Sequence, residues 1–226
     1  MKELFKKYNF DITEEKLLLF HNYYVDLVEK NKVMNLTTVT EEKEVYIKHF
    51  LDSILPLSEI KDNSKILDVG TGAGFPGIPL KIMNDSLNLV LLDSLNKRIN
   101  FLNEEINKLG LNGITAIHSR VEDYANVSRE TFDYVVSRAV AKLNTLCEYC
   151  LPFVKVGGYF IAYKSGGFVQ EKEEAKRAIQ ILGGKIDKVL SFNLEGNERC
   201  LILIKKICAT PKKYPRGQNK PRISPL

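Results

Sequence analysis

The spacing of apolar residues predicts that the first part of the chain is helical. Apolar side chains recur three or four positions apart at Leu17, Phe20, Tyr24, Leu27 and Val28. Asp11, with Glu14 three residues later, is the predicted start of this helix. Thr40 is expected to cap a second helix. Residues 1–60 therefore form a predicted α-helical extension.

From Lys65 onward, short apolar strands alternate with amphipathic helices. The predicted strands cover residues 65–69, 87–93, 114–118, 132–137, 159–164, 185–192 and 200–207. The predicted helices between them cover residues 77–83, 96–109, 143–153 and 170–182. This alternation is typical of an α/β fold with a mostly parallel twisted sheet and helices on both faces. Only a short polar segment ending in Glu195-Gly196-Asn197 separates the last two strands, so we expect a C-terminal antiparallel hairpin.

The turn after the first predicted strand is rich in glycine. Gly70, Gly72 and Gly74 allow a tight turn and the close approach of a ligand that a Cβ atom would block. Asp93 ends the next strand, where a carboxylate can accept hydrogen bonds from both hydroxyls of a ribose. Ligands of parallel sheets bind at the carboxyl ends of the strands, so these four residues are candidate cofactor contacts.

Two classes of cofactor compete for this loop. The spacing Gly72-x-Gly74-x-x-Gly77 matches the dinucleotide fingerprint, in which a pyrophosphate sits on a helix N-terminus. However, Pro76 and Pro79 remove two N–H donors from the start of the following helix. A hydride-transferring enzyme would also normally need a second nucleotide-binding half or a substrate domain, whereas this chain ends in a hairpin. Both features weigh against a dinucleotide.

Five segments, in this order, resemble a Rossmann-like class I methyltransferase: DVGTGAG, LLDS, SRVEDY, FDYVVSRA and VKVGGYFIAYK. The resemblance covers about residues 60–207 and implies S-adenosylmethionine as the cofactor. In such enzymes the glycine loop lies under the methionine part, and the acid after the second strand holds the ribose. The loop after the third strand contacts the adenine, which implies roles for Val121, Glu122 and Asp123. A solvated turn is the alternative for the two acids.

Further segments narrow the resemblance to one family. They are LDSILPL, GTGAGFPGIPL, LLDSLNKRINFL, SRAVAKL, KSG, NERCLILIKK and the tail YPRGQNKP. Together they resemble the glucose-inhibited division protein B family, which methylates N7 of a guanine in 16S ribosomal RNA. The resemblance implies cofactor contacts at Gly70, Phe75, Val121, Glu122 and Arg138. Arg138 is also the candidate catalytic residue, because it directly follows the fourth strand and should point into the cleft.

The resemblance divides the chain into three parts. Residues 1–60 are the helical extension, residues 61–208 the expected S-adenosylmethionine-dependent methyltransferase domain, and residues 209–226 a basic, proline-rich tail.

The implied reaction needs positioning and charge management rather than a strong base. Guanine N7 already carries a free lone pair, so no proton has to leave before methylation. Ser137-Arg138-Ala139 after the fourth strand differs from the N-P-P-Y stretch of enzymes that methylate exocyclic amines. A cytosine-C5 enzyme would need a cysteine nucleophile, but Cys147 and Cys150 lie on a helical apolar face. We expect buried thiols there and no metal site.

One histidine lies near the expected cleft. His49 and Asp52 share one face of the second predicted helix, three positions apart. The pair could pack over the cofactor cleft or be a structural contact with no part in binding.

The basic residues concentrate at the C-terminus. The net charge is +5, and residues 201–226 carry no acidic side chain. This asymmetry predicts a polyanionic partner, the alternative being a solubilising tail. The prolines of the tail favour an extended segment, which we expect to have no part in cofactor binding. Tyr214, which lies in this segment, could stack on a base of the RNA. The candidate RNA-binding residues are Lys164, Arg199, Lys212, Lys213, Arg216 and Arg222.

The expected partner is 16S rRNA or the small ribosomal subunit. No apolar run approaches the length of a membrane span, and the N-terminus lacks the apolar core of a signal peptide. We therefore expect a cytoplasmic monomer without a membrane partner. The alternatives are a methyltransferase acting on another RNA or a small molecule, and an RNA-binding module that needs the cofactor but has no activity.

Overall fold

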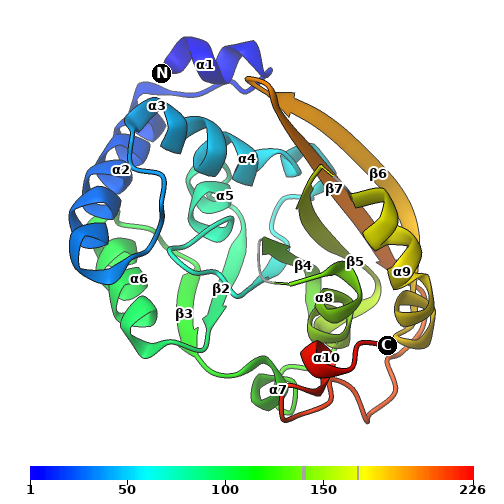
Figure 1. Cartoon of the computed structure of the whole chain (residues 1–226). Coiled ribbons are helices and arrows are strands. Elements are labelled where there is room, and N and C mark those ends of the chain that lie inside the picture. Colours follow the sequence, from blue (N-terminus) through cyan, green and yellow to red (C-terminus); the bar gives the residue numbers. More distant parts are fainter. Residues whose placement is uncertain (139–140, 167) are drawn as a thin grey trace.

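The computed structural model describes residues 1–138, 141–166 and 168–226 (Figure 1). This part of the chain forms one seven-stranded sheet in the order β3-β2-β1-β4-β5-β7-β6. Strands β1 to β5 run parallel, whereas β7 is antiparallel to both β5 and β6. The predicted parallel sheet with a closing hairpin is confirmed. The strands are β1 (Lys65–Val69), β2 (Asn88–Asp93), β3 (Ile114–His118), β4 (Phe132–Arg138), β5 (Val154–Ser165), β6 (Gly184–Leu194) and β7 (Asn197–Lys206).

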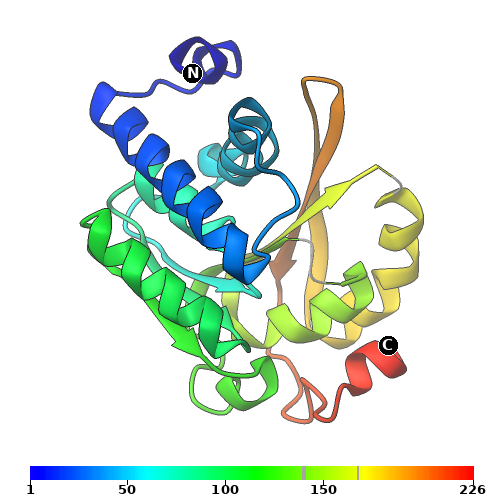
Figure 2. The same ribbon diagram turned by 60° about the vertical axis from the view of Figure 1, so that its left-hand side comes forward.

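Helices cover both faces of the sheet (Figures 1 and 2). Residues of α2 (Glu14–Met34), α5 (Gly77–Met83) and α6 (Asn96–Lys108) belong to the apolar cluster of one face. Residues of α8 (Leu143–Cys150) and α9 (Phe168–Ile181) belong to the cluster of the other face. No helix among the described residues is long and apolar enough to cross a membrane.

The N-terminal extension shares the core of the first face. Besides α2, it contains α1 (Lys2–Lys7), α3 (Glu42–Val45), the π-helical turn η1 (Tyr46–Leu51), α4 (Asp52–Ile54) and the 3₁₀ turn η2 (Leu57–Glu59). The buried rings of Phe20 and Phe50 lie 4.9 Å apart, and the ring of Tyr23 lies 5.4 Å from that of Phe75 in the glycine loop. Aromatic packing therefore fixes η1 against this loop.

Several predicted boundaries were wrong by a few residues. Thr13, rather than Asp11, caps α2, and its Oγ1 accepts a hydrogen bond from the Lys16 N–H at 3.2 Å. Glu41, rather than Thr40, caps α3, because its carboxylate accepts bonds from two N–H groups of the first turn. Strand β5 begins earlier than predicted. A capping residue is defined by the geometry of its side chain at the end of the helix. Neighbouring polar residues are equally good candidates when only the sequence is considered.

Two other predicted elements are more complex in the structure. The predicted helix over residues 143–153 ends at Cys150 and continues as the 3₁₀ turn η3 (Leu151–Phe153). The predicted turn after the third strand contains the short helix α7 (Val121–Tyr124). The Ala139 part of the Ser137-Arg138-Ala139 motif lies outside the described residues.

The C-terminal tail is folded onto the body of the molecule, so the predicted extended segment is wrong. It ends in α10 (Lys220–Ile223), which packs against α8 (Figure 1). Thr210, Tyr214 and Pro221 are buried. With its ring 6% exposed, Tyr214 is not available to stack on a base as we had expected. Packing of these apolar and small side chains outweighs the repulsion among the basic residues of the tail.

Candidate active site

The glycine loop lies where the strand order reverses, between β1 and β4. Gly70, Gly72 and Gly74 all adopt positive φ angles of 72°, 63° and 103°, which side chains rarely tolerate. A Cβ atom on Gly72 would meet nothing within 4 Å, whereas one on Gly74 would lie 2.6 Å from Cδ1 of Ile78. Gly72 thus keeps the site open, and Gly74 lets the next helix approach.

Asp68, the residue of β1 before Val69, holds the loop from below. Its Oδ2 accepts hydrogen bonds from Thr71 Oγ1 at 2.7 Å and from the Gly77 N–H at 2.9 Å. Its Oδ1 is buried and has no hydrogen-bond partner among the described residues. Because burial disfavours its charged form, the pKa of Asp68 rises to about 7.

A cavity of about 580 Å³ opens above this loop. Seven of the eight predicted cofactor-binding residues line it: Gly70, Gly72, Phe75, Asp93, Val121, Glu122 and Arg138. The eighth, Gly74, faces Ile78 and Tyr23 instead and serves the packing of the loop. Residues from β1, β2, α7 and β4 are thereby brought together at one edge of the sheet, as the parallel topology predicts.

Asp93 is bonded to the chain on three sides. Its Oδ2 accepts hydrogen bonds from the Gly72 N–H at 3.0 Å and from Arg98 at 3.1 Å, and its Oδ1 accepts one from the Leu95 N–H at 2.9 Å. A carboxylate offers about four acceptor positions. The geometry leaves room for a further donor, while the three bonds fix the carboxylate in place.

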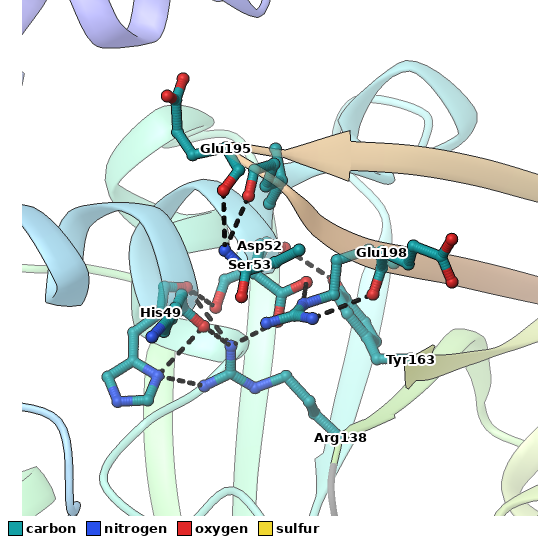
Figure 3. A network of polar contacts seen from close by, with 11 residues as sticks. His49, Asp52, Ser53, Arg138, Tyr163, Glu195 and Glu198 are labelled. Carbon is teal, nitrogen blue, oxygen red and sulfur yellow. Dashed lines mark hydrogen bonds and ion pairs between the residues drawn. The ribbon is translucent and has the colours of Figure 1, made fainter. Parts of the chain in front are cut away.

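Arg138 forms an ion pair that sequence reasoning did not assign to it. Its guanidinium points from the end of β4 toward Asp52 and His49 (Figure 3). Nη1 lies 2.9 Å from Asp52 Oδ2 and 3.1 Å from the carbonyl oxygen of Lys48. The other carboxylate oxygen of Asp52 lies 3.2 Å from Nε of Arg199. One buried carboxylate therefore holds two arginines, one from β4 and one from β7.

His49 lies at the cleft in neutral form. Its ring stacks on Phe75 at 4.7 Å, and its Nε2 lies 2.8 Å from Thr37 Oγ1. Burial, reinforced by the charge of Arg138, lowers its pKa to about 3. Of the two expected roles for His49, the structure supports packing at the cofactor cleft, since the residue lines the cavity.

A second cavity of about 500 Å³ adjoins the first, and His49 and Arg138 line both. Two predicted RNA-binding residues, Lys164 and Arg199, line this second cavity. Both are already paired within the chain. The Nζ of Lys164 lies 2.6 Å from Glu171 Oε2 and donates to the carbonyl of Ala141, and Arg199 binds Asp52. Glu171 offsets the charge of Lys164, and Asp52 offsets that of Arg199 in part because it is shared with Arg138, so both residues are bound into the wall of the cavity.

The predicted RNA-binding residues of the tail fall into three groups. Lys212 and Lys213 are exposed. Arg216 binds the buried Glu148 at 2.7 Å, so its predicted contact with RNA is replaced by an internal ion pair. Arg222 lines the cofactor cavity together with Asn219. The tail therefore reaches the cavity that the predicted cofactor-binding residues line.

Cys147 and Cys150 are free and fully buried, as predicted. They belong to the apolar cluster between the sheet and α8. Burial raises the pKa of both thiols, which keeps them protonated and poorly nucleophilic. Among the described residues, no group of three or more metal-ligating side chains comes together.

Several residues that line the cavity escaped the analysis of the sequence as cofactor contacts, among them Arg98, Tyr149, Asn219 and Arg222. Arg98 could have been found, because it follows Asp93 within the first turn of a predicted helix. Asn219 and Arg222 lie within and directly after the tail motif YPRGQNKP, far along the chain from the glycine loop, and the docking of α10 on α8 brings them to the cavity.

The family model described as rRNA small subunit methyltransferase G (GidB) matches residues 16–202. The chain belongs to this family. It is 54% identical to the ribosomal RNA small subunit methyltransferase G of Lachnoclostridium phytofermentans, covering 96% of this chain and 92% of the relative. The protein of the same name from Staphylococcus aureus is 47% identical, with 100% and 97% covered.

Solved structures with this fold are methyltransferases of lower sequence similarity. The TYW2 protein of M. jannaschii in complex with AdoMet superposes with a TM-score of 0.56 at 17% identity, covering 70% of this chain and 74% of that one. A SAM-dependent methyltransferase from Aquifex aeolicus has a TM-score of 0.54 at 20% identity, with 71% and 92% covered. The fold is thus the Rossmann-like class I methyltransferase fold.

Proposed function

We propose that this chain transfers a methyl group from S-adenosylmethionine to N7 of a guanine in 16S ribosomal RNA. The observation that carries the proposal is the pair of adjoining cavities that share His49 and Arg138. One cavity has the glycine loop and carboxylate of a nucleoside site, and the other is large enough for a base. Membership of the rRNA small subunit methyltransferase G family supports this choice of substrate.

The first cavity fits the cofactor in size and chemistry. Its volume of about 580 Å³ lies within the range of roughly 300–1,000 Å³ that small-molecule sites occupy. Gly72 leaves the space above the loop free, and the Asp93 carboxylate can accept a further hydrogen bond from a ribose hydroxyl. Phe75 offers an apolar surface, and Val121 and Glu122 form the end expected to hold the adenine. Bound there, S-adenosylmethionine supplies an electrophilic methyl group on a sulfonium.

The second cavity positions the guanine. Tyr163 is held rigidly, since its hydroxyl donates a 2.6 Å hydrogen bond to the carbonyl of Ser53. Glu171 has one carboxylate oxygen bound to Lys164 and to the Leu143 N–H. Its other oxygen can accept from the N1–H and N2–H₂ groups that distinguish guanine from adenine. The residues act by holding the base in line with the methyl group, because N7 has no proton to lose.

The charge at the junction of the cavities suits a base that becomes cationic. Methylation at N7 places a positive charge on the guanine, which a bare arginine nearby would oppose. Here Asp52 is shared by Arg138 and Arg199, so it offsets one of the two positive charges, and the lowered pKa of His49 keeps the imidazole from adding a further one. We therefore assign Arg138 a positioning and electrostatic role rather than proton transfer.

Lys212 and Lys213 are the residues through which the tail contacts the RNA backbone in this proposal. Both are exposed. Each can neutralise one phosphate, which adds affinity without reading sequence. The protein acts as a monomer in this scheme, because residues of a single chain line both cavities, and it acts in the cytoplasm, the compartment of the proposed rRNA substrate.

Chemical mapping of the modified base tests the proposal. Borohydride–aniline treatment cleaves RNA at 7-methylguanosine, so 16S rRNA from a deletion strain should lose one cleavage that the wild-type gene restores. Persistence of the cleavage in the deletion strain, or methylation of RNA containing 7-deazaguanine, would contradict the N7 assignment. Labelled cofactor offered with small subunits, naked rRNA, tRNA and small molecules distinguishes the alternative substrates.

A further inference from the structure

The C-terminal segment 209–226 is clamped to the body at its beginning. Arg129, in the loop before β4, donates hydrogen bonds of 2.7 Å to the carbonyl of Tyr214 and 2.7 Å to that of Thr210. A further bond of 3.0 Å reaches the carbonyl of Pro211. A guanidinium that satisfies three backbone carbonyls fixes the path of the chain at this point.

A second clamp holds the middle of the segment. Arg216 donates to the carboxylate of Glu148 through its backbone N–H at 2.8 Å, Nε at 2.8 Å and Nη2 at 2.7 Å. Glu148 lies on α8 and is 1% exposed. Such a bidentate pair is specific in geometry, and Glu148 would be a buried charge without it. The tail is therefore part of the folded structure.

A third contact sets the position of α10 beside the cofactor cavity. Thr145 Oγ1 on α8 donates a 2.9 Å hydrogen bond to the carbonyl of the buried Pro221. The residues on either side of this contact, Asn219 and Arg222, line the cavity together with Tyr149. The hydroxyl of Tyr149 interacts with Arg222 and, through its charge, with Glu122 of α7. The tail thus reaches the end of the cavity that α7 forms.

We propose that residues 209–226 form a wall of the cofactor site, in which Asn219 and Arg222 contact the nucleoside part of S-adenosylmethionine. This inference rests on the proposed function. The amide of Asn219 can donate and accept hydrogen bonds at the edge of an adenine, and the planar guanidinium of Arg222 can stack on a base or donate to its ring nitrogens. The family match ends at residue 202, so this wall lies beyond the part of the chain that the family model covers.

A matched pair of double variants tests the wall. Asn219 and Gln218 both have positive φ angles, of 56° and 60°, so glycine replaces either one without backbone strain. Lys220, like Arg222, is an exposed basic residue of α10. The test variant is Asn219→Gly/Arg222→Ala, and the control is Gln218→Gly/Lys220→Ala.

Isothermal titration calorimetry with S-adenosylhomocysteine and with 5′-methylthioadenosine gives the readout. The test variant should bind both ligands about tenfold more weakly than wild type, which corresponds to about 1.4 kcal/mol. The control should keep the wild-type affinity, and both variants should keep the wild-type circular dichroism spectrum. The second ligand lacks the amino acid, so an equal loss with both ligands places the contact at the nucleoside.

The outcomes separate this inference from the proposed function. Three results would contradict the proposal that the tail contacts the nucleoside. They are an unchanged affinity of the test variant, an equal loss of affinity in the control, and a loss of affinity for S-adenosylhomocysteine alone. Failure of the wild-type protein to bind either ligand would instead overturn the proposed function.

Discussion

Two arginine–carboxylate pairs lie on different sides of the cofactor cavity, and they have different surroundings. Arg138 binds Asp52 at 2.9 Å, and Arg216 binds Glu148 at 2.7 Å. Both carboxylates are buried. Arg138 lines the two cavities, and its partner Asp52 also holds Arg199. Arg216, by contrast, packs the tail against α8 and donates to the carbonyl of Ser224.

The comparison shows that the charge of an arginine does not define its role. Both arginines were candidates for contact with a ligand or with RNA when only the sequence was considered. Arg138 remains a candidate because its paired guanidinium still borders open volume. Arg216 is instead held within the chain, since its backbone N–H, Nε and Nη2 donate to Glu148 and Nη2 also donates to the carbonyl of Ser224. Variants at the two sites should separate catalysis from stability.

Arg138→Ala is expected to have the largest effect, and the effect should fall on activity. Loss of the guanidinium removes one of the two arginines that hold Asp52 and the contact with His49 at the junction of the cavities, so we expect kcat/KM to drop about 100-fold or more, or roughly 2.7 kcal/mol. Methyl transfer to small subunits measures the change, and thermal unfolding is the control. Activity within a few-fold of wild type would remove Arg138 from the site.

Arg216→Met is expected to reduce stability more than chemistry. It leaves Glu148 buried without a partner, and we expect a loss of about 2 kcal/mol in the free energy of unfolding. The loss should be smaller than for a fully buried pair, because a quarter of the Arg216 side chain is exposed. Urea unfolding measures it. The double variant Glu148→Gln/Arg216→Met should recover part of the stability, and no recovery would contradict the pairing.

Asp93→Ala differs from both, because Asp93 holds the glycine loop and faces the cofactor. We expect cofactor affinity to fall by about 1–2 kcal/mol, the cost of a lost charged hydrogen-bond acceptor. Calorimetry with S-adenosylhomocysteine provides the measurement. Asp85→Ala, on the loop before β2, is a control that should bind normally. Equal affinities for both variants would exclude Asp93 as a cofactor contact.

The smallest expected effect is that of pH on His49, which lies beside Arg138 and is neutral in the folded protein. Since its pKa is lowered to about 3, His49 should not titrate near neutrality, so the NMR signals of its ring should not shift between about pH 6 and 8, the range in which Asp68, with a pKa of about 7, titrates. Below about pH 6.5, His49 is protonated in the unfolded chain but stays neutral in the folded protein. Protonation therefore favours the unfolded state, and the contribution of His49 to the free energy of unfolding should decline as the pH falls from about 6.5 to 3. A His49 ring signal that titrates near pH 6.5 would contradict the assignment.

The prediction of the fold succeeded where short segments carry their own signal. The alternation of KILDV, LNLVLLD and ITAIH with amphipathic helices fixes the parallel sheet, because each strand and helix is recognisable within its own window. Capping residues and the short helices α1, α7 and α10 were missed, since a few residues give too little periodicity. The tail was wrongly predicted to be extended, because its composition shows its charge but not the surface against which it packs.

The sequence by itself determined the class I fold, the glycine loop and Asp93, and with them the place of the cofactor. These features depend on local backbone conformation and on the general rule that parallel strands end at one edge. Only the tertiary structure decided which arginines are paired and which residues close the cavity. The partners Asp52 and Arg138 lie 86 positions apart, and Glu148 and Arg216 lie 68 apart. Electrostatic pairing acts through space, so no local pattern in the chain could specify it.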